Sequence, residues 1–326
     1  MRRRRTWTIV ALAVLFVLLA AGCGDDKKDS TTATTTPGTA TTVAPAFAPG
    51  STMANIQARG KMIVGVKYDQ PGFGQKNPTT NEVEGFDVET AKLIAVGIFG
   101  GTPESVTSKI EFKEAISKNR ERFISEDGPD KVDMVVATYT INDARKQVVD
   151  FAGPYFVAKQ DIMVKASDNA IKSVTDLNGK KVCTAKGSTS EPNVKAKAPQ
   201  AEIVLFDTYS QCAEALADGR FDAETTDDSI LAGLVQQSSG KFKLVGAPFS
   251  DEPYGIGMKK GDDAFRTFIN DQLEKIEASG EWAKAFAATL GTLGLPTPTP
   301  PKINRYGSTP AAPTTTAAAT TSTSTG

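Results

Sequence analysis

Short runs of β-branched and apolar residues alternate with helix-periodic segments along this chain, and this alternation constrains the fold most strongly. The runs predicted as strands are 61–67, 109–115, 131–137, 161–165, 180–185, 201–206, 221–226, 241–246 and 254–260. Helices are predicted over 85–98, 119–125, from about 189, over 209–218, and through the amphipathic region after 260. Such alternation is typical of βαβ units on mainly parallel sheets, so the predicted fold class is α/β.

The predicted units fall into two sets, followed by a last strand and helices that can return to the first set. We therefore expect a discontinuous first lobe (54–158 and 249–295) and a second lobe (159–248), joined by crossings near 155–161 and 247–254. Ligands of open α/β sheets bind outside the carboxyl ends of the strands. A cleft between two such lobes is therefore the predicted site.

The two ends of the chain differ from its body in composition. Residues 1–22 join MRRRR to an apolar stretch too short for a comfortable span, as in a signal peptide. The segment LLAAGC places Cys23 after small residues, which resembles a lipobox; an ordinary secretory signal with an incidental cysteine is the alternative. Either one predicts export. Residues 23–53 and 296–326 are rich in Thr, Pro and Ala, which predicts a flexible tether and a disordered tail.

The residue inventory excludes several classes of function. The chain has no histidine and three cysteines, which excludes a His-based triad, a His-ligated metal site and a Cys–His nucleophile pair. Its 37 basic residues balance 38 acidic ones, so nothing points to nucleic acid. We expect no catalytic residue, no metal, no cofactor and no nucleic-acid partner.

Two cysteines, Cys183 and Cys212, remain in the predicted folded body. An even pair in an oxidising compartment predicts one disulfide, and two buried free thiols are the alternative.

Polar side chains follow five of the predicted strands at the points where the strands end. They are Lys67, Gln70, Ser117, Arg120, Thr138, Thr140 and Arg145 in the first half, and Ser188, Thr189, Asp227 and Asp228 in the second. None of these exits contains a nucleophile paired with a base. The pattern therefore favours capture of a small polar molecule.

Arg145 follows the strand 131–137 and two threonines. Thr140, with Asp143 three residues later, is predicted to cap a helix that carries Arg145 on its first turns. A guanidinium there would match a carboxylate bidentately. The alternative is a surface arginine paired with a nearby acidic residue such as Asp150.

The second half supplies complementary groups. Ser188 with Glu191 fits a capping box, whose free N–H groups near Thr189 would favour an anion. Of Asp227 and Asp228, one would cap the following helix and one would accept an ammonium group. Plain helix caps are the alternative at both places. Together these groups complement an α-amino acid.

The order of these motifs resembles the family 3 extracellular solute-binding proteins, which deliver polar amino acids to ABC importers. The motifs are KMIVGVKYDQPGFG, GFDVETAKLIA, SKNR, TYTINDARKQVVDFAGPYF, KGSTSE and GRFDAETTDDSILAG, and together they span about 54–290. Within the family the chain looks similar to actinobacterial glutamate-binding lipoproteins. The resemblance implies a two-lobed, type II periplasmic-binding-protein-like fold.

The resemblance also implies roles for the residues at the strand exits. Arg145 would hold the ligand α-carboxylate, assisted by Thr140, by the backbone at Thr138, and by the N–H groups of Ser188 and Thr189. Asp227 would hold the α-ammonium, with Asp228 as a cap. Phe73 and Tyr139 would line the pocket.

Basic residues at Lys67 and Arg120, with the hydroxyl of Ser117, imply an acidic ligand, glutamate or aspartate; glutamine and asparagine stay open. Cys183 and Cys212 would both lie in the second lobe, as in a strand–helix disulfide.

The expected protein is a monomer, lipid-anchored through Cys23 to the outer face of the membrane. It would close on its ligand and dock on an ABC permease. Two alternatives belong to other classes. One is a sensor that presents its ligand to a signalling protein. The other is a cyclohexadienyl-dehydratase-like enzyme, for which Lys67, Lys159 or Glu191 would supply the general acid.

Overall fold

The computed structural model describes residues 44–306. The predicted signal peptide, Cys23 and most of the predicted tether lie outside these residues. No helix between residues 44 and 306 is long and apolar enough to cross a membrane.

A mixed sheet of nine strands runs through the described part of the chain, in the order β5-β1-β6-β12-β7-β10-β8-β9, with β11 paired to β7. The strands are β1 (Met62–Val66), β5 (Ile110–Glu114), β6 (Met134–Val135), β7 (Val149–Lys165), β8 (Lys181–Ala185), β9 (Glu202–Phe206), β10 (Ala223–Asp227), β11 (Phe242–Leu244) and β12 (Ser250–Lys259). β1 is parallel to β5 and β6, and β8 is parallel to β9 and β10. The predicted α/β class is confirmed.

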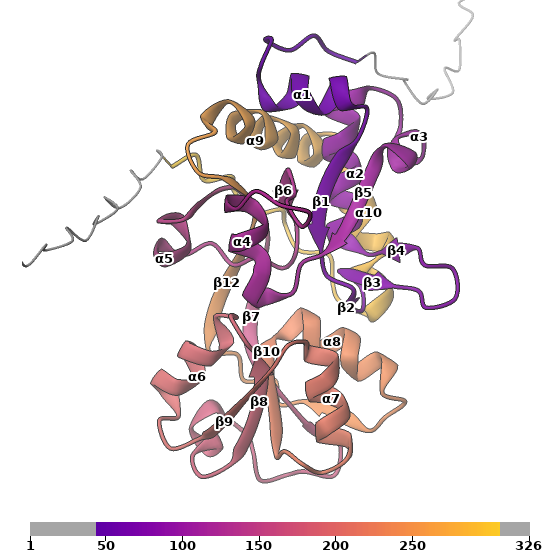
Figure 1. Cartoon of the computed structure of the whole chain (residues 1–326). Coiled ribbons are helices and arrows are strands. Elements are labelled where there is room, and N and C mark those ends of the chain that lie inside the picture. The colour runs from indigo at the N-terminus through magenta and orange to yellow at the C-terminus, as the bar shows by residue number, and fades with distance from the viewer. Residues whose placement is uncertain (1–43, 307–326) are drawn as a thin grey trace, which may run out of the picture. The chain divides into compact units, whose positions relative to one another are not determined.

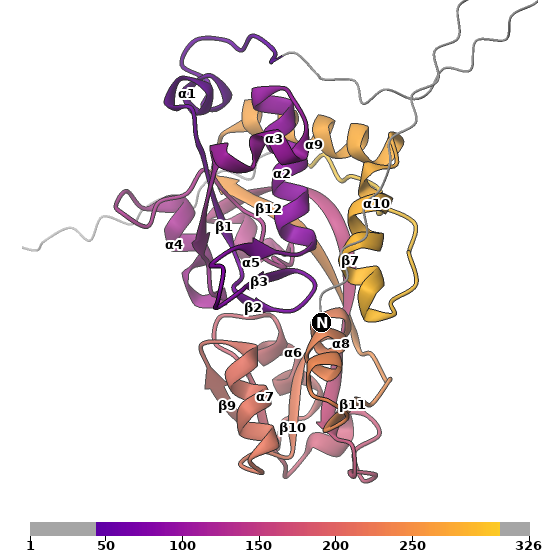
Figure 2. The same ribbon diagram turned by 90° about the vertical axis from the view of Figure 1, so that its right-hand side faces the viewer.

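Helices surround the two ends of this sheet (Figures 1 and 2). Around the first end lie α1 (Thr52–Arg59), α2 (Phe86–Phe99), α3 (Pro103–Val106), α4 (Arg120–Ser125), α5 (Asp143–Lys146), α9 (Asp263–Ala278) and α10 (Glu281–Ala288). Around the second lie α6 (Ser190–Lys197), α7 (Tyr209–Ala217) and α8 (Asp228–Gln237). Between residues 44 and 306, four 3-10 turns complete the helical elements: η1 (Thr107–Lys109), η2 (Ser117–Asn119), η3 (Val174–Leu177) and η4 (Leu290–Leu293).

Two long antiparallel strands join the lobes. β7 and β12 pair from Val149↔Lys259 to Gln160↔Ser250, with an irregularity between Tyr254 and Ile256. The crossings predicted near 155–161 and 247–254 are therefore largely strand. The predicted lobe boundaries, 158/159 and 248/249, fall inside β7 and directly before β12.

Each lobe has its own buried apolar side chains. In the first lobe an aromatic cluster gathers beneath α2 and α10, where Phe86 packs edge-on against Trp282 with ring centroids 5.5 Å apart. One face of the second lobe buries Ile162, Val182 and Val194. Burial of this kind supplies most of the favourable free energy of folding, at about 25 cal/mol per Å² of apolar surface.

The disulfide prediction is confirmed, because Cys183 of β8 is bonded to Cys212 of α7. The amphipathic region after 260, predicted as one helical region, is divided into α9 and α10 at Gly280, whose φ of 81° lies in the left-handed region. The sequence prediction also missed a small antiparallel sheet formed by β2 (Asp69–Gln70), β3 (Gly74–Lys76) and β4 (Val83–Glu84).

The predicted disordered tail is wrong over residues 303–306. Ile303 is buried, and Asn304 N–H donates to the carbonyl of Gly153 at 2.8 Å. Arg305 binds Asp271 at 2.6 Å, and the hydroxyl of Tyr306 accepts a 2.6 Å hydrogen bond from Phe151 N–H. Apolar and aromatic side chains within the Pro-rich segment give it enough buried contact to order. The end of the predicted flexible tether also packs against the folded body, because the ring of Phe47 lies edge-on against Phe268.

Candidate functional site

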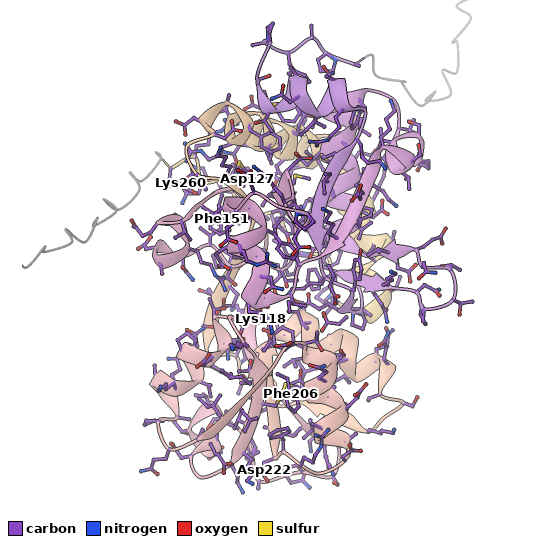
Figure 3. All side chains as sticks on the ribbon, in the orientation of Figure 1. Lys118, Asp127, Phe151, Phe206, Asp222 and Lys260 are labelled. Atoms are coloured by element: carbon purple, nitrogen blue, oxygen red, sulfur yellow. A yellow bond between two sulfur atoms is a disulfide. The ribbon has the colours of Figure 1, made fainter. Side chains whose placement is uncertain are left out.

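The segments that follow the predicted strands and carry polar side chains, in both lobes, meet at the junction between the lobes. Lys118, in the exit after β5, lies where the two groups of elements meet in Figure 3, and its Nζ is 2.6 Å from Asp207 of the second lobe. Gly187, after β8, lies so close to this exit that a Cβ there would be 2.7 Å from the Cα of Lys118. Its φ of 78° and this close approach both require glycine.

Arg145 is buried at the junction, so the alternative of a surface arginine is wrong. Nη1 donates to the carbonyl of Thr140 at 2.8 Å, Nη2 donates to the carbonyl of Gly187 at 3.1 Å, and Nε is 3.6 Å from Glu121. Burial lowers the pKa of Arg145 to about 10, with the charge of Arg120 acting in the same direction. The guanidinium is still a cation at neutral pH.

The predicted cap of the helix that carries Arg145 is also wrong. Asn142, whose side chain accepts from Arg145 N–H at 2.9 Å, is the cap of α5. Thr140 instead forms a β-bridge with Tyr254 of β12. The alternative partner Asp150 is bound to Lys260 at 3.0 Å.

Arg120 holds a strained turn. Thr138 has a φ of 45°, which is unfavourable for a β-branched residue. Arg120 donates to the carbonyls of Ala137 (3.0 Å) and Thr138 (3.2 Å), and the N–H of Thr138 donates to Asp87 at 3.0 Å. The Arg120 guanidinium also stacks over Tyr139, 4.2 Å from its ring centre. Most of its donors are therefore used by backbone carbonyls.

Lys67, Ser117 and Gln70 lie on the first-lobe side of the junction. Lys67 is buried, and its Nζ donates to Ser117 Oγ at 2.8 Å. Burial lowers the pKa of Lys67 to about 7, and the charge of Arg120 adds to this shift. Gln70 Oε1 is 3.0 Å from Thr138 Oγ1, while Gln70 Nε2 has no hydrogen-bond partner among residues 44–306.

The two predicted aromatic residues occupy different environments. The ring centre of Tyr139 is 4.2 Å from the guanidinium of Arg120 and 4.9 Å from that of Arg145, and its hydroxyl donates to Glu121 at 2.7 Å. Phe73 is buried in the aromatic cluster, with ring centroids 5.6 Å from both Phe156 and Tyr254.

The second-lobe loop after β8 carries Ser188 and Thr189. α6 begins at Ser190, after Thr189, and has no side-chain cap, so the predicted capping box of Ser188 and Glu191 is wrong. The buried Ser188 Oγ has no hydrogen-bond partner in the described part of the chain.

Asp227 ends β10 and is buried. Its Oδ2 accepts a hydrogen bond from the hydroxyl of Tyr254, and its Oδ1 is unpartnered within residues 44–306. Burial raises the pKa of Asp227 to about 8, and the carboxylate of Glu252 adds to that shift. Asp228 is the first residue of α8, which has no side-chain cap, so the predicted cap is wrong. Its carboxylate accepts from Lys159 N–H at 3.2 Å. The two aspartates therefore have different surroundings, and the unpartnered oxygen belongs to Asp227.

Glu252 on β12 is a functional candidate that the sequence prediction missed. Its Oε2 accepts from Thr140 at 2.8 Å and from Thr189 at 2.7 Å, and its Oε1 accepts from Asn193 at 2.8 Å and Ser250 at 2.7 Å. This one buried carboxylate therefore orients a predicted ligand-binding threonine on each lobe. Glu252 was missed because it lies in a predicted crossing between the lobes. An acidic residue two positions before the predicted strand at Tyr254 was the feature that could have identified it.

These groups define what the junction can bind. The first lobe contributes a buried arginine and a buried lysine, and the second contributes a carboxylate oxygen and a hydroxyl that have no partners within residues 44–306. Buried polar atoms are normally hydrogen-bonded, so the unpartnered ones favour a small polar ligand.

The chain is similar to proteins of known class. A sequence model of the bacterial extracellular solute-binding proteins, family 3, matches residues 62–292. The ABC transporter glutamine-binding protein GlnH of Bacillus subtilis is 37% identical over 87% of this chain and 96% of its own length. The glutamate-binding protein GluB of Corynebacterium glutamicum is 40% identical over 71% of this chain and 79% of its own length.

Solved structures agree with this similarity. An ancestral arginine-binding protein bound to glutamine has a TM-score of 0.64 and 37% identity, covering 72% of this chain and 99% of that protein. The solute receptor for L-cysteine of Neisseria gonorrhoeae has a TM-score of 0.68 and 26% identity, covering 74% of this chain and 95% of the receptor. This chain belongs to the bacterial extracellular solute-binding proteins, family 3.

Proposed function

We propose that this protein is an extracytoplasmic receptor that binds an acidic amino acid or its amide by closure of its lobes and delivers it to an ABC permease. The observation that carries this proposal is a buried hydrogen-bond donor and a buried unpartnered acceptor on different lobes. Arg145 is a buried cation on the first lobe, and Asp227 presents an unpartnered buried oxygen on the second. An α-amino acid brings the complementary groups, a carboxylate for the guanidinium and an ammonium that favours the ionised form of Asp227, whose pKa burial raises to about 8.

The ligand class is glutamate or aspartate, with glutamine and asparagine next. Lys67 and the unpartnered Gln70 Nε2 are donors suited to a side-chain carboxylate or amide oxygen. Relatives named for glutamine and for glutamate support this class. Arg120, bound to backbone carbonyls, acts on the ligand chiefly by holding the turn at Thr138.

Ligand contacts on both lobes favour the closed state and shift the population toward it. Lipidation of Cys23 would keep the receptor near its permease. The receptor is therefore proposed to work at the outer face of the membrane.

Calorimetric titration with each of the common amino acids tests this function. Glutamate or aspartate is expected to bind most tightly, and lysine and arginine at least about a hundredfold more weakly, because Lys67 and Arg120 repel a cation. Tightest binding of a cationic amino acid, or of none, would overturn the proposal. Uptake measured in a deletion strain separates transport from sensing.

A further inference from the structure

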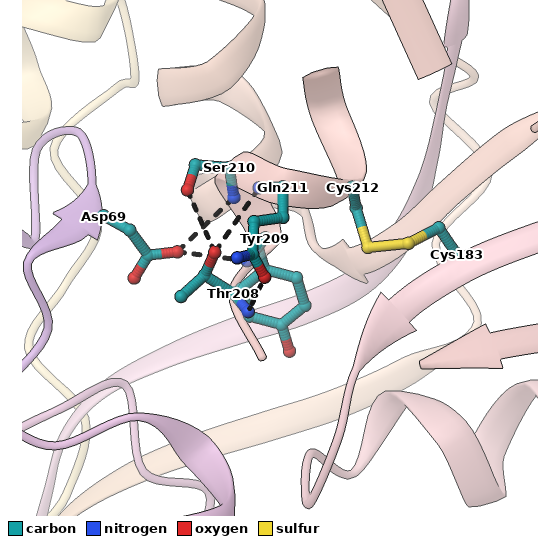
Figure 4. The surroundings of a disulfide bond; sticks show 7 residues. All are labelled: Asp69, Cys183, Thr208, Tyr209, Ser210, Gln211 and Cys212. Atoms are coloured by element: carbon teal, nitrogen blue, oxygen red, sulfur yellow. Dashed lines mark hydrogen bonds between the residues drawn. A yellow bond between two sulfur atoms is a disulfide. The ribbon is translucent and has the colours of Figure 1, made fainter. Parts of the chain in front are cut away.

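Asp69 connects the two lobes away from the residues proposed to bind the ligand. It lies in β2, between Lys67 and Gln70 in sequence order, but its carboxylate is directed at the second lobe (Figure 4). Oδ2 accepts hydrogen bonds from the N–H groups of Tyr209 at 3.0 Å and Ser210 at 3.4 Å. These are the first two residues of α7.

Two backbone N–H groups at the start of α7 have no hydrogen-bond partner within the second lobe and are free to bind Asp69. The capping box of Thr208 and Gln211 satisfies the N–H of Gln211 (3.4 Å) and the N–H of Thr208 (3.3 Å) within the second lobe. The first N–H groups of a helix have no partner inside the helix. Asp69 therefore binds the two remaining donors, at the end of the helix where a negative charge is favoured.

The disulfide links this helix to the ligand loop. Cys212 of α7 is bonded to Cys183 of β8, as Figure 4 shows. β8 ends at Ala185, and Gly187, which accepts from Arg145, lies two residues further along the chain. A contact that fixes α7 against the first lobe therefore also fixes the strand that carries the ligand loop.

We propose that Asp69 is a positioning residue for lobe closure, its carboxylate capping the first turn of α7 across the cleft and stabilising the closed state. This inference rests on the proposed function, because closure is the step assigned to Asp69. Since the ligand is not its partner, its contribution is the same for every ligand that closes the lobes.

A second interlobe contact near the same helix provides a matched control. Lys118 and Asp207 pair at 2.6 Å, but their side chains are 33% and 48% exposed. Exposed pairs of this kind contribute little, because solvent screens them. Asp207→Ala thus removes a contact between the same two lobes without the helix cap.

Binding of L-glutamate and L-glutamine to Asp69→Ala, Asp69→Asn and Asp207→Ala tests the proposal by calorimetry. Asp69→Ala is expected to raise Kd about tenfold for both ligands, Asp69→Asn about threefold, and Asp207→Ala less than about twofold. The increase should be in the dissociation rate. An unchanged Kd for Asp69→Ala, or an increase for only one of the two ligands, would overturn it.

Amide hydrogen exchange at Tyr209 and Ser210 tests the helix cap without depending on ligand binding. If wild type binds neither amino acid, the proposed function fails, but the exchange measurement still tests the contact of Asp69 with α7. Protection of these two amides in wild type and its loss in Asp69→Ala, with the rest of α7 unchanged, support the cap. Equal exchange in both proteins would contradict it.

Discussion

Arg145 Nη2, in the first lobe, donates a hydrogen bond of 3.1 Å to the carbonyl oxygen of Gly187, in the second. The same guanidinium binds the carbonyl of Thr140 on its own lobe at 2.8 Å. The residue proposed to recognise the α-carboxylate therefore also joins the two ligand loops. Recognition and closure depend on one side chain.

Replacing Arg145 by lysine should raise the Kd of every α-amino acid by about a hundredfold or more, because an ammonium cannot reproduce the planar, bidentate hydrogen bonding of a guanidinium. Calorimetric titration with glutamate and glutamine measures the loss. Arg122→Ala serves as the control, since Arg122 is an exposed arginine paired with Asp130 at 3.0 Å. Near wild-type affinity in Arg145→Lys would refute the clamp.

The preference for glutamate over glutamine should fall as pH rises through the pKa of Lys67, which burial lowers to about 7. Below that pH the ammonium is already charged and attracts the side-chain carboxylate. Above it, glutamate must bring a proton to Lys67, so the preference declines by up to about tenfold per pH unit until the higher pKa of the complex is reached. Asp227 affects both ligands alike and cancels in the ratio of the two Kd values.

Lys67→Met provides the control for this pH dependence. The variant should show a ratio of Kd values for glutamate and glutamine that is flat from about pH 6 to about pH 9. A slope that persists in Lys67→Met would assign the effect to another group.

Glu224→Gln should stabilise the protein at alkaline pH. Glu224 is buried in β10, and neither carboxylate oxygen has a partner among the described residues. Burial raises its pKa well above the ordinary value, with Asp69 adding to the shift. Between the ordinary and the raised pKa the folded state holds a proton that the unfolded state has lost, so stability falls as pH rises through this window.

Thermal unfolding as a function of pH tests this. Near pH 8 the Tm of Glu224→Gln should exceed that of wild type by about a few degrees, and the difference should shrink toward about pH 4. Glu214→Gln, an exposed change on α7, should follow wild type. Parallel profiles for Glu224→Gln and wild type would show that the buried carboxyl does not titrate in this range.

A chain ending at Leu295 should melt about a few degrees below one ending at Tyr306, because it lacks the contacts of residues 303–306 with β7 and α9. The chain ending at Tyr306 keeps all of these contacts and should match the full chain. Equal Tm values for the two shortened chains would mean that these contacts add nothing to stability.

Local patterns were enough to predict much of the fold. β-branched runs located β1, β5, β8 and β9 to within a residue or two, and the helix predicted over 209–218 matches α7. These features depend on neighbours in sequence. The motif order predicted the family for the same reason.

The interlobe contacts could not be predicted in this way. Thr189 and Glu252 are 63 residues apart, and Asp69 and Tyr209 are 140 apart, so no local spacing relates them. The left-handed turn at Thr138 is imposed by its partners Arg120 and Asp87, against the preference of a β-branched residue. The order of residues 303–306 was concealed by the Pro-rich composition around them.

The most direct test of the account compares amino acids with analogues that lack the α-carboxylate. L-Glutamate and L-glutamine are titrated into the protein beside 4-aminobutanoate and 4-aminobutanamide, which keep the ammonium and the side-chain group. If Arg145 holds the α-carboxylate, each analogue should bind at least about a hundredfold more weakly than its parent amino acid. An analogue that binds as tightly as its parent would contradict the account.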